Sequence, residues 1–129
     1  MKYLLDTHLL LWASTNNAKL PTGAAAIIED RDNQLWMSVI SLWEVAIKSA
    51  QRKPDFPYEP DQLRIGLLSN GYEELKMESR HVLALKNLPR VHSDPFDRLL
   101  VSQAITEGMF FLTADQQLSE YGERVIIVK

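Results

Sequence analysis

The sequence predicts an α/β protein: a three-layer sandwich in which helices cover both faces of a central, mostly parallel sheet. Two observations predict this class. Short apolar runs alternate along the chain with longer segments of helical character. The apolar runs are also continuous, which is typical of strands that are buried on both faces of a parallel sheet. With 129 residues, the chain can bury one hydrophobic core region, so we expect residues 1–129 to form one domain.

The elements are predicted from these patterns and from their boundary residues. The first half is expected to contain strands at 2–5 and 35–38 and helices at 8–14, 21–30 and 39–51. Residues 53–60 hold three prolines and should form a loop, because proline cannot continue a helix. The second half is expected to contain helices at 61–70, 79–87 and 95–107 and strands at 74–77, 109–112 and 125–128. The last helix is the best marked, with Pro95 in its first turn and Gly108 just past its end.

Composition and charge limit the classes of function. The formal net charge of −3 argues against a large basic surface that binds nucleic acid by counterion release. It does not exclude nucleic acid as a substrate that meets carboxylates through a bound cation. There is no cysteine, so a thiolate metal site is excluded. The opening MKYLLDTHLLLWAST has the lysine and apolar run of a signal peptide, but Asp6 and His8 interrupt a run that is too short to span a bilayer. We therefore expect a cytoplasmic protein with no membrane segment.

Acidic residues follow three of the predicted strands or lie in the helices after them. Asp6 directly follows the first strand, Glu44 lies within two turns of the second, and Asp115 follows the strand at 109–112. Ligands of an open parallel sheet bind outside the carboxyl ends of its strands. The three acids are therefore expected at one edge of the sheet, each with a nearby hydroxyl.

Each acid also has a purely structural explanation. Asp6 and Asp115 could cap the turns that follow them. Glu44 could form an i, i+4 ion pair with Lys48 on a solvated helix face, although its mostly apolar neighbours leave little such face. Asp94 before Pro95 is a good N-cap, whereas local rules leave Asp97 open, as a charge favoured by the helix dipole or as part of a site.

Taken together, four acids without cysteine suit a hard divalent cation such as Mg²⁺ or Mn²⁺. A water activated by such an ion can attack a phosphodiester. Packed without a metal, the same carboxylates would repel one another. The set is therefore more informative than any one of its members.

The segments LLDTHLLLW, SLWEVAIK, DPFDRLLVSQA and LTAD resemble, in this order, the motifs of PIN-domain ribonucleases, in particular the VapC-like toxins of bacterial toxin–antitoxin pairs. The resemblance extends from residue 4 to residue 115. By position it implies that the catalytic and metal-binding acids are Asp6, Glu44, Asp97 and Asp115. The supporting residues that it implies are Thr7, Ser41, Thr113, Asp94 and Arg98. Of these, Asp94 is expected to act as the cap, and Arg98 has two possible partners, an RNA phosphate or a carboxylate.

The resemblance implies a Mg²⁺- or Mn²⁺-dependent endoribonuclease that cleaves cellular RNA, is inhibited by a cognate antitoxin protein and forms a homodimer. Trp12 and Trp43 could contribute to a partner groove, although aromatic residues at helical spacing more often pack in a core. Two other classes stay open. A phospho-receiver would need paired acids after the first strand, where only Asp6 stands. A binding module that holds RNA or a partner without cleavage would be expected to carry a basic, aromatic-rich surface.

Overall fold

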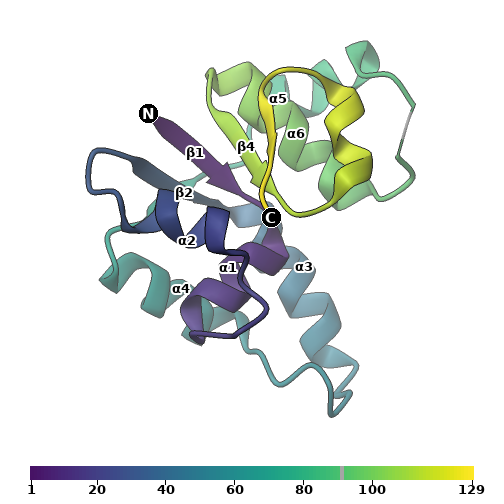
Figure 1. Ribbon diagram of the computed structural model, residues 1–129. Coiled ribbons are helices and arrows are strands. Elements are labelled where there is room, and N and C mark those ends of the chain that lie inside the picture. Colours follow the sequence, from purple (N-terminus) through teal and green to yellow (C-terminus); the bar gives the residue numbers. More distant parts are fainter. Residues whose placement is uncertain (91) are drawn as a thin grey trace.

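One five-stranded sheet organises the computed structural model, which describes residues 1–90 and 92–129 (Figure 1). The strands have the order β3-β2-β1-β4-β5, and each neighbouring pair is parallel. Their bounds are β1 Lys2–Leu5, β2 Gln34–Ser38, β3 Glu73–Leu75, β4 Phe110–Thr113 and β5 Val125–Ile127. The first strand of the chain therefore lies at the centre, between β2 and β4. The predicted α/β class is confirmed.

Helices cover both faces of this sheet, as Figure 1 shows. One layer consists of α1 (Thr7–Ser14), α2 (Thr22–Glu29) and α4 (Pro60–Ser69). The other consists of α5 (Ser79–Leu83), α6 (Pro95–Glu107) and two 3₁₀ turns, η1 (Ala84–Asn87) and η2 (Gln116–Tyr121). The helix α3 (Val39–Ala50) contacts α1 and α4 of the first layer and α6 of the second.

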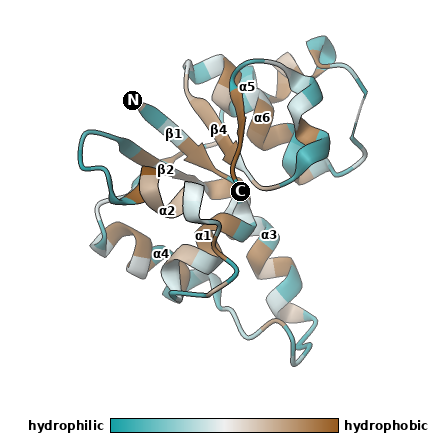
Figure 2. Cartoon of the chain, in the orientation of Figure 1, coloured by the Kyte–Doolittle hydropathy of each residue, from teal (hydrophilic) through white to brown (hydrophobic). Residues whose placement is uncertain are grey.

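The sheet divides the expected single core into two hydrophobic cores, and alternating side chains of the strands contribute to both. Tyr3 and Leu5 of β1 belong to the core under α1, α2 and α4, whereas Leu4 belongs to the core under α6. Successive side chains of a strand point to opposite faces, so one apolar run serves both layers. Figure 2 shows the result as hydrophobic strands in the middle of the molecule, with polar residues at the loops. This is why the strands read as continuous apolar runs.

The predicted helix at 79–87 is divided in two. Its first part is α5 and its second is the 3₁₀ turn η1, which ends at Asn87. Leu88 has the extended ψ of 136° because it precedes Pro89, whose ring disfavours the helical conformation of the residue before it. The turn that precedes Leu88 is therefore a tighter 3₁₀ turn and not an α-helical one.

The outward face of α3 exposes apolar side chains that the sequence predicted to be buried. Trp43 is 51% exposed and Ile47 is 41% exposed. Trp12 packs partly buried against the first core, as expected, but the interpretation of Trp43 as a core residue is wrong. The Trp43 ring instead packs edge to face on Phe96, with the ring centroids 4.9 Å apart. A membrane-spanning helix is not found in the described part of the chain, where none combines the needed length and apolarity.

Candidate active site

The carboxyl ends of β1 and β4 meet where the strand order reverses. The chain moves outward from β1 through β2 to β3 on one side and from β4 to β5 on the other. The helices that follow the strands diverge at such a point and leave a crevice. Asp6 lies at the end of β1 and Asp115 just after β4, so the topology brings residues from both ends of the chain together.

Asp6 and Asp115 are joined by the hydroxyl of Thr113. This buried hydroxyl donates to Asp6 Oδ2 and accepts from the backbone N–H of Asp115 at 3.0 Å. The other oxygen of Asp6, Oδ1, accepts from the N–H of Leu9 at 2.8 Å and caps α1. Burial raises the pKa of Asp6 above its usual value, against the lowering effect of the Thr113 and Leu9 hydrogen bonds. Thr113 therefore supports the pocket physically, by orienting two of the predicted acids.

Asp115 and Asp97 face each other across His92. The Nε2 atom of His92 lies 3.3 Å from Asp115 Oδ2 and 3.8 Å from Asp97 Oδ2. The three side chains each place one ligand atom within 4.8 Å of the others. Because His92 Nδ1 accepts from the N–H of Asp94 at 3.1 Å, the proton of the neutral ring is on Nε2 and points at the carboxylates.

Asp97 carries the strongest electrostatic signal of the site. Its pKa is raised to about 7, first by burial and then by the negative charges of Asp94, Asp6 and Glu44, while His92 acts in the opposite direction. Negative charge is therefore concentrated around Asp97 beyond what the neighbouring protein groups compensate. A perturbed carboxyl of this kind in a crevice marks a candidate functional site.

Glu44 is buried, with 3% of its surface exposed, although α3 is otherwise partly open to solvent. Its Oε1 accepts from the Thr7 hydroxyl at 2.7 Å, and its Oε2 pairs with Lys48 at 2.8 Å. Ser41 Oγ lies 2.9 Å from Thr7 Oγ1, behind this pair. The ion pair with Lys48, which the sequence suggested as a structural explanation of Glu44, is therefore present. Its carboxylate is buried and does not lie on a solvated helix face.

The first turn of α6 presents Asp97 and Arg98. Its N-cap is Asp94, whose Oδ1 accepts from the N–H groups of Phe96 at 2.9 Å and Asp97 at 3.3 Å. The predicted capping role of Asp94 is confirmed. Within residues 1–90 and 92–129, Arg98 forms no ion pair with a carboxylate.

His92 and Lys48 are the neighbours of the acids that sequence reasoning missed as site residues. Lys48 was recognised only as a possible surface partner of Glu44. His92 stands in a loop before the N-cap, so no helical or strand periodicity marks it. The one available signal was its position two residues before Asp94, from which its ring can accept the Asp94 N–H.

These residues fit a divalent cation. Mg²⁺ and Mn²⁺ prefer oxygen ligands, and carboxylates from α3, from α6 and from the ends of β1 and β4 lie here. The pKa of Asp97 is raised by burial and then by the neighbouring negative charges, and a cation would neutralise those charges. Carboxylate oxygens have two lone pairs each, so the protein hydrogen bonds to Asp6 and Asp115 leave them able to bind an ion.

The sequence matches a known protein family along most of its length. The family model described as the PIN domain matches residues 3–124, a range that contains all four acids. The chain belongs to the PIN domain family. It is 30% identical to Ribonuclease VapC22 of Mycobacterium tuberculosis, over an alignment that covers 92% of this chain and 90% of that protein.

Solved structures share the fold of this PIN domain. Chains in VapBC2 from Rickettsia felis, bound to a promoter DNA fragment, and in a toxin-antitoxin complex from Klebsiella pneumoniae both match with a TM-score of 0.67. They are 18% and 15% identical and cover 98% and 96% of this chain, and this chain covers 97% and 95% of theirs. VapBC-1 from nontypeable Haemophilus influenzae matches with a TM-score of 0.63, at 19% identity and 98% coverage of both chains. At this level of identity the likeness concerns the fold, and the predicted PIN-like architecture is confirmed.

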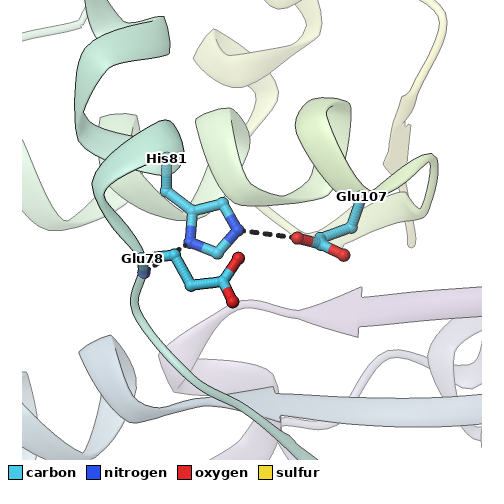
Figure 3. A group of neighbouring side chains, drawn as sticks. All are labelled: Glu78, His81 and Glu107. Atoms are coloured by element: carbon cyan, nitrogen blue, oxygen red, sulfur yellow. Dashed lines mark hydrogen bonds and ion pairs between the residues drawn. The ribbon is translucent and has the colours of Figure 1, made fainter.

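A second group of titratable residues in this PIN domain has a structural role. Figure 3 shows His81 between Glu78 and Glu107. His81 is fully buried, its Nδ1 accepts from the Glu78 N–H at 3.0 Å, and its Nε2 lies 2.8 Å from Glu107 Oε2. Both ring nitrogens are therefore used, and Arg80 pairs with both carboxylates. The group caps α5 and ties it to α6 through the His81–Glu107 contact.

Proposed function

We propose that this PIN domain is a Mg²⁺- or Mn²⁺-dependent endoribonuclease and the toxin of a toxin–antitoxin pair. The observation that carries the proposal is that Asp6, Glu44, Asp97 and Asp115 come from four separate segments of the chain to the carboxyl ends of β1 and β4. Identity of 30% to a protein named Ribonuclease VapC22, over almost the whole chain, supports the reaction class.

The four acids would have different tasks. Asp97, Asp115 and Asp6 would hold the ion. The Oδ2 atoms of Asp97 and Asp115 both lie near His92 Nε2, and Asp6 Oδ2 accepts from Thr113. Glu44 would act through ordered water, because Mg²⁺ keeps several waters and Lys48 already pairs with this carboxylate. When bound, the ion lowers the pKa of a water molecule for attack on the phosphodiester and stabilises charge on the phosphate oxygens. Lys48 would hold the buried Glu44 in position through their ion pair, and His92 would hold Asp97 and Asp115 in place through Nε2.

The proposal includes an antitoxin protein and a homodimer. The structural neighbours from Rickettsia felis and Haemophilus influenzae are VapBC assemblies, and the Klebsiella pneumoniae neighbour is a toxin-antitoxin complex. The exposed Trp43 and Ile47 on α3 supply apolar surface beside the first turn of α6, close to the acids. A partner that covers this surface would block the site. Light scattering of the purified chain, alone and with its antitoxin, tests both parts.

Cleavage of a structured RNA pool tests the catalytic proposal. Purified, antitoxin-free protein is incubated with Mn²⁺, with Mg²⁺ and with EDTA, beside Asp97→Asn and Asp61→Asn. Asp61 is an exposed acid in the first turn of α4, so its variant controls for loss of a helix-start charge. We expect metal-dependent cleavage by the wild type and Asp61→Asn and none by Asp97→Asn. Cleavage that survives both EDTA and Asp97→Asn would refute the proposed mechanism.

A further inference from the structure

A cavity of about 520 Å³ opens beside the acidic site, and its lining residues are Arg90, His92, Ser93, Arg98 and Gln117. We refer to it as the arginine pocket. His92 belongs to the pocket and to the site at once, because its Nε2 lies 3.3 Å from Asp115 Oδ2. The pocket and the acids are therefore adjacent parts of one surface, of opposite charge.

The two arginines of this pocket lack carboxylate partners. Elsewhere, Arg64 pairs with Glu74 at 2.7 Å and Arg80 pairs with Glu78 at 2.6 Å. Neither Arg90 nor Arg98 forms an ion pair with any residue of 1–90 or 92–129, although acids are close by in sequence. Two cations that share a cavity and have no carboxylate partner there would attract an anion.

Arg98 supplies a second, independent observation. Its Nε–H is buried and has no hydrogen-bond acceptor within the described parts of the chain. A buried donor without a partner costs free energy, so such a group is expected to acquire an acceptor. Arg98 lines the cavity, and the fork of an arginine side chain fits the oxygens of a phosphate.

The position of the pocket favours a nucleic-acid backbone over other anions. Arg98 directly follows Asp97, so their Cα atoms are about 3.8 Å apart. A phosphodiester chain that reaches the acids would be repelled by Asp94, Asp97 and Asp115 at each phosphate that no cation neutralises. Arginines next to the acids remove that repulsion for the neighbouring phosphate, whereas the molecule as a whole, with a net charge of −3, does not attract it.

We propose that the arginine pocket binds the RNA phosphate next to the one that is cleaved, with Arg98 as the main contact and Arg90 as the second. Contacts of this kind position a nucleic acid without reading its sequence. The assignment of the ligand as RNA rests on the proposed nuclease function. The pocket would set the register of the substrate on the acids, which is a role separate from the cleavage step.

Binding without cleavage tests this inference. A fluorescein-labelled, single-stranded oligoribonucleotide of mixed sequence is titrated with protein in EDTA at several salt concentrations. We expect Arg98→Gln to weaken binding about tenfold and to reduce the slope of log affinity against log salt by about 0.7. Arg98→Lys should keep the salt slope, because the charge remains, but lose part of the affinity with the fork. Arg90→Gln, a change at an exposed residue that should not disturb folding, should weaken binding in the same direction.

Arg31→Gln is the matched control, because Arg31 is exposed and precedes β2 at the opposite edge of the sheet. If Arg98→Gln and Arg90→Gln bind the RNA as tightly as Arg31→Gln does, the inference is overturned even when the protein cleaves RNA in Mn²⁺. If they bind it more weakly but the wild type cleaves nothing, the pocket stands and the nuclease proposal fails. A second titration uses poly-L-glutamate in place of RNA. If Arg98→Gln and Arg90→Gln lose binding to poly-L-glutamate but still bind RNA as the wild type does, the pocket binds a protein carboxylate and the inference is also overturned.

Discussion

At the residue scale, one carboxylate of this protein can cap a helix and also belong to the candidate site. Asp6 uses Oδ1 to cap α1 and turns Oδ2 to Thr113, and Asp115 uses Oδ1 to cap η2 and turns Oδ2 to His92. The capping and functional explanations of these acids are therefore compatible. Local sequence rules could not choose between them because both describe the same side chain.

The raised pKa of Asp97 predicts how pH changes the stability of the metal-free protein. In the folded state the pKa is about 7, above the ordinary 3.8, so the native protein binds more protons than the unfolded chain between these values. The stabilising contribution is complete below about pH 4 and is lost as the pH rises through 7. In EDTA at pH 8, Asp97→Asn should therefore be more stable than the wild type by about 1 to 2 kcal/mol, after solvent screening.

Urea unfolding from pH 4 to pH 8 measures this difference. The two proteins should converge near pH 4 and separate as the pH rises. If Asp97→Asn is instead less stable by about 0.3–1 kcal/mol at pH 8, then Asp97 acts mainly as a favourable charge at the helix start.

Thr113 predicts an effect of one hydroxyl on two acids. In Thr113→Val, Asp6 Oδ2 loses a donor and the Asp115 N–H loses its acceptor, at constant side-chain shape. We expect a loss of about 1–3 kcal/mol of stability and of about tenfold or more in metal affinity or activity. Thr113→Ser is the control because it retains the hydroxyl. Calorimetric Mn²⁺ titration of both variants should separate them, and equal affinities would contradict the bridging role.

At the element scale, α6 connects the site to the layer beneath it. Its first turn presents Asp97 and Arg98, and its middle carries the fully buried Gln103. Gln103 Oε1 accepts from the hydroxyl of Ser38 at 2.5 Å, and its Nε2 lies 3.3 Å from His81 Nδ1. Since Ser38 also caps α3, one amide holds the helix of Glu44 and the helix of Asp97 in a fixed relation.

Gln103→Leu should break this connection. The Ser38 hydroxyl would lose its buried acceptor, at an expected cost of about 1–3 kcal/mol in the free energy of unfolding. Ile105→Gln, on an exposed position of the same helix, should change stability by only about 0.5 kcal/mol. Chemical denaturation of both variants gives the comparison. A Gln103→Leu variant as stable as the control would mean that the network does not hold the helices together.

At the scale of the whole molecule, the sequence predicted the helices and strands, whose positions depend on residues close together in the chain. Pro95, Gly108 and the continuous apolar runs are local signals, and they placed the helices and strands to within a few residues. The contact of His92 with Asp115 and that of Ser38 with Gln103 join residues 23 and 65 positions apart. No local rule encodes such pairs. The exposure of Trp43 was missed for the same reason, because periodicity cannot tell a core-facing apolar stripe from one that faces solvent.

Metal binding should stabilise the whole fold, because the acids that would hold the ion come from both ends of the chain. At ten times the dissociation constant, Mn²⁺ should add about 1.4 kcal/mol, or about 5 °C in Tm for a protein of this length. Thermal unfolding with Mn²⁺ and with EDTA measures this shift. It should be absent in Asp97→Asn and retained in Asp61→Asn, and a shift of equal size in both variants would point to a different ion site.

The pairing of β1 with β4 has a consequence for biosynthesis. Leu5 pairs with Leu112, so the central strand β1 cannot pair with β4 until more than a hundred further residues have been synthesised. During translation the amino-terminal acids leave the ribosome long before Thr113 and Asp115 do, and domains fold as units. A nascent chain therefore has no assembled acidic crevice. The nuclease proposed above could therefore act only after the segment that carries Thr113 and Asp115 has emerged from the ribosome.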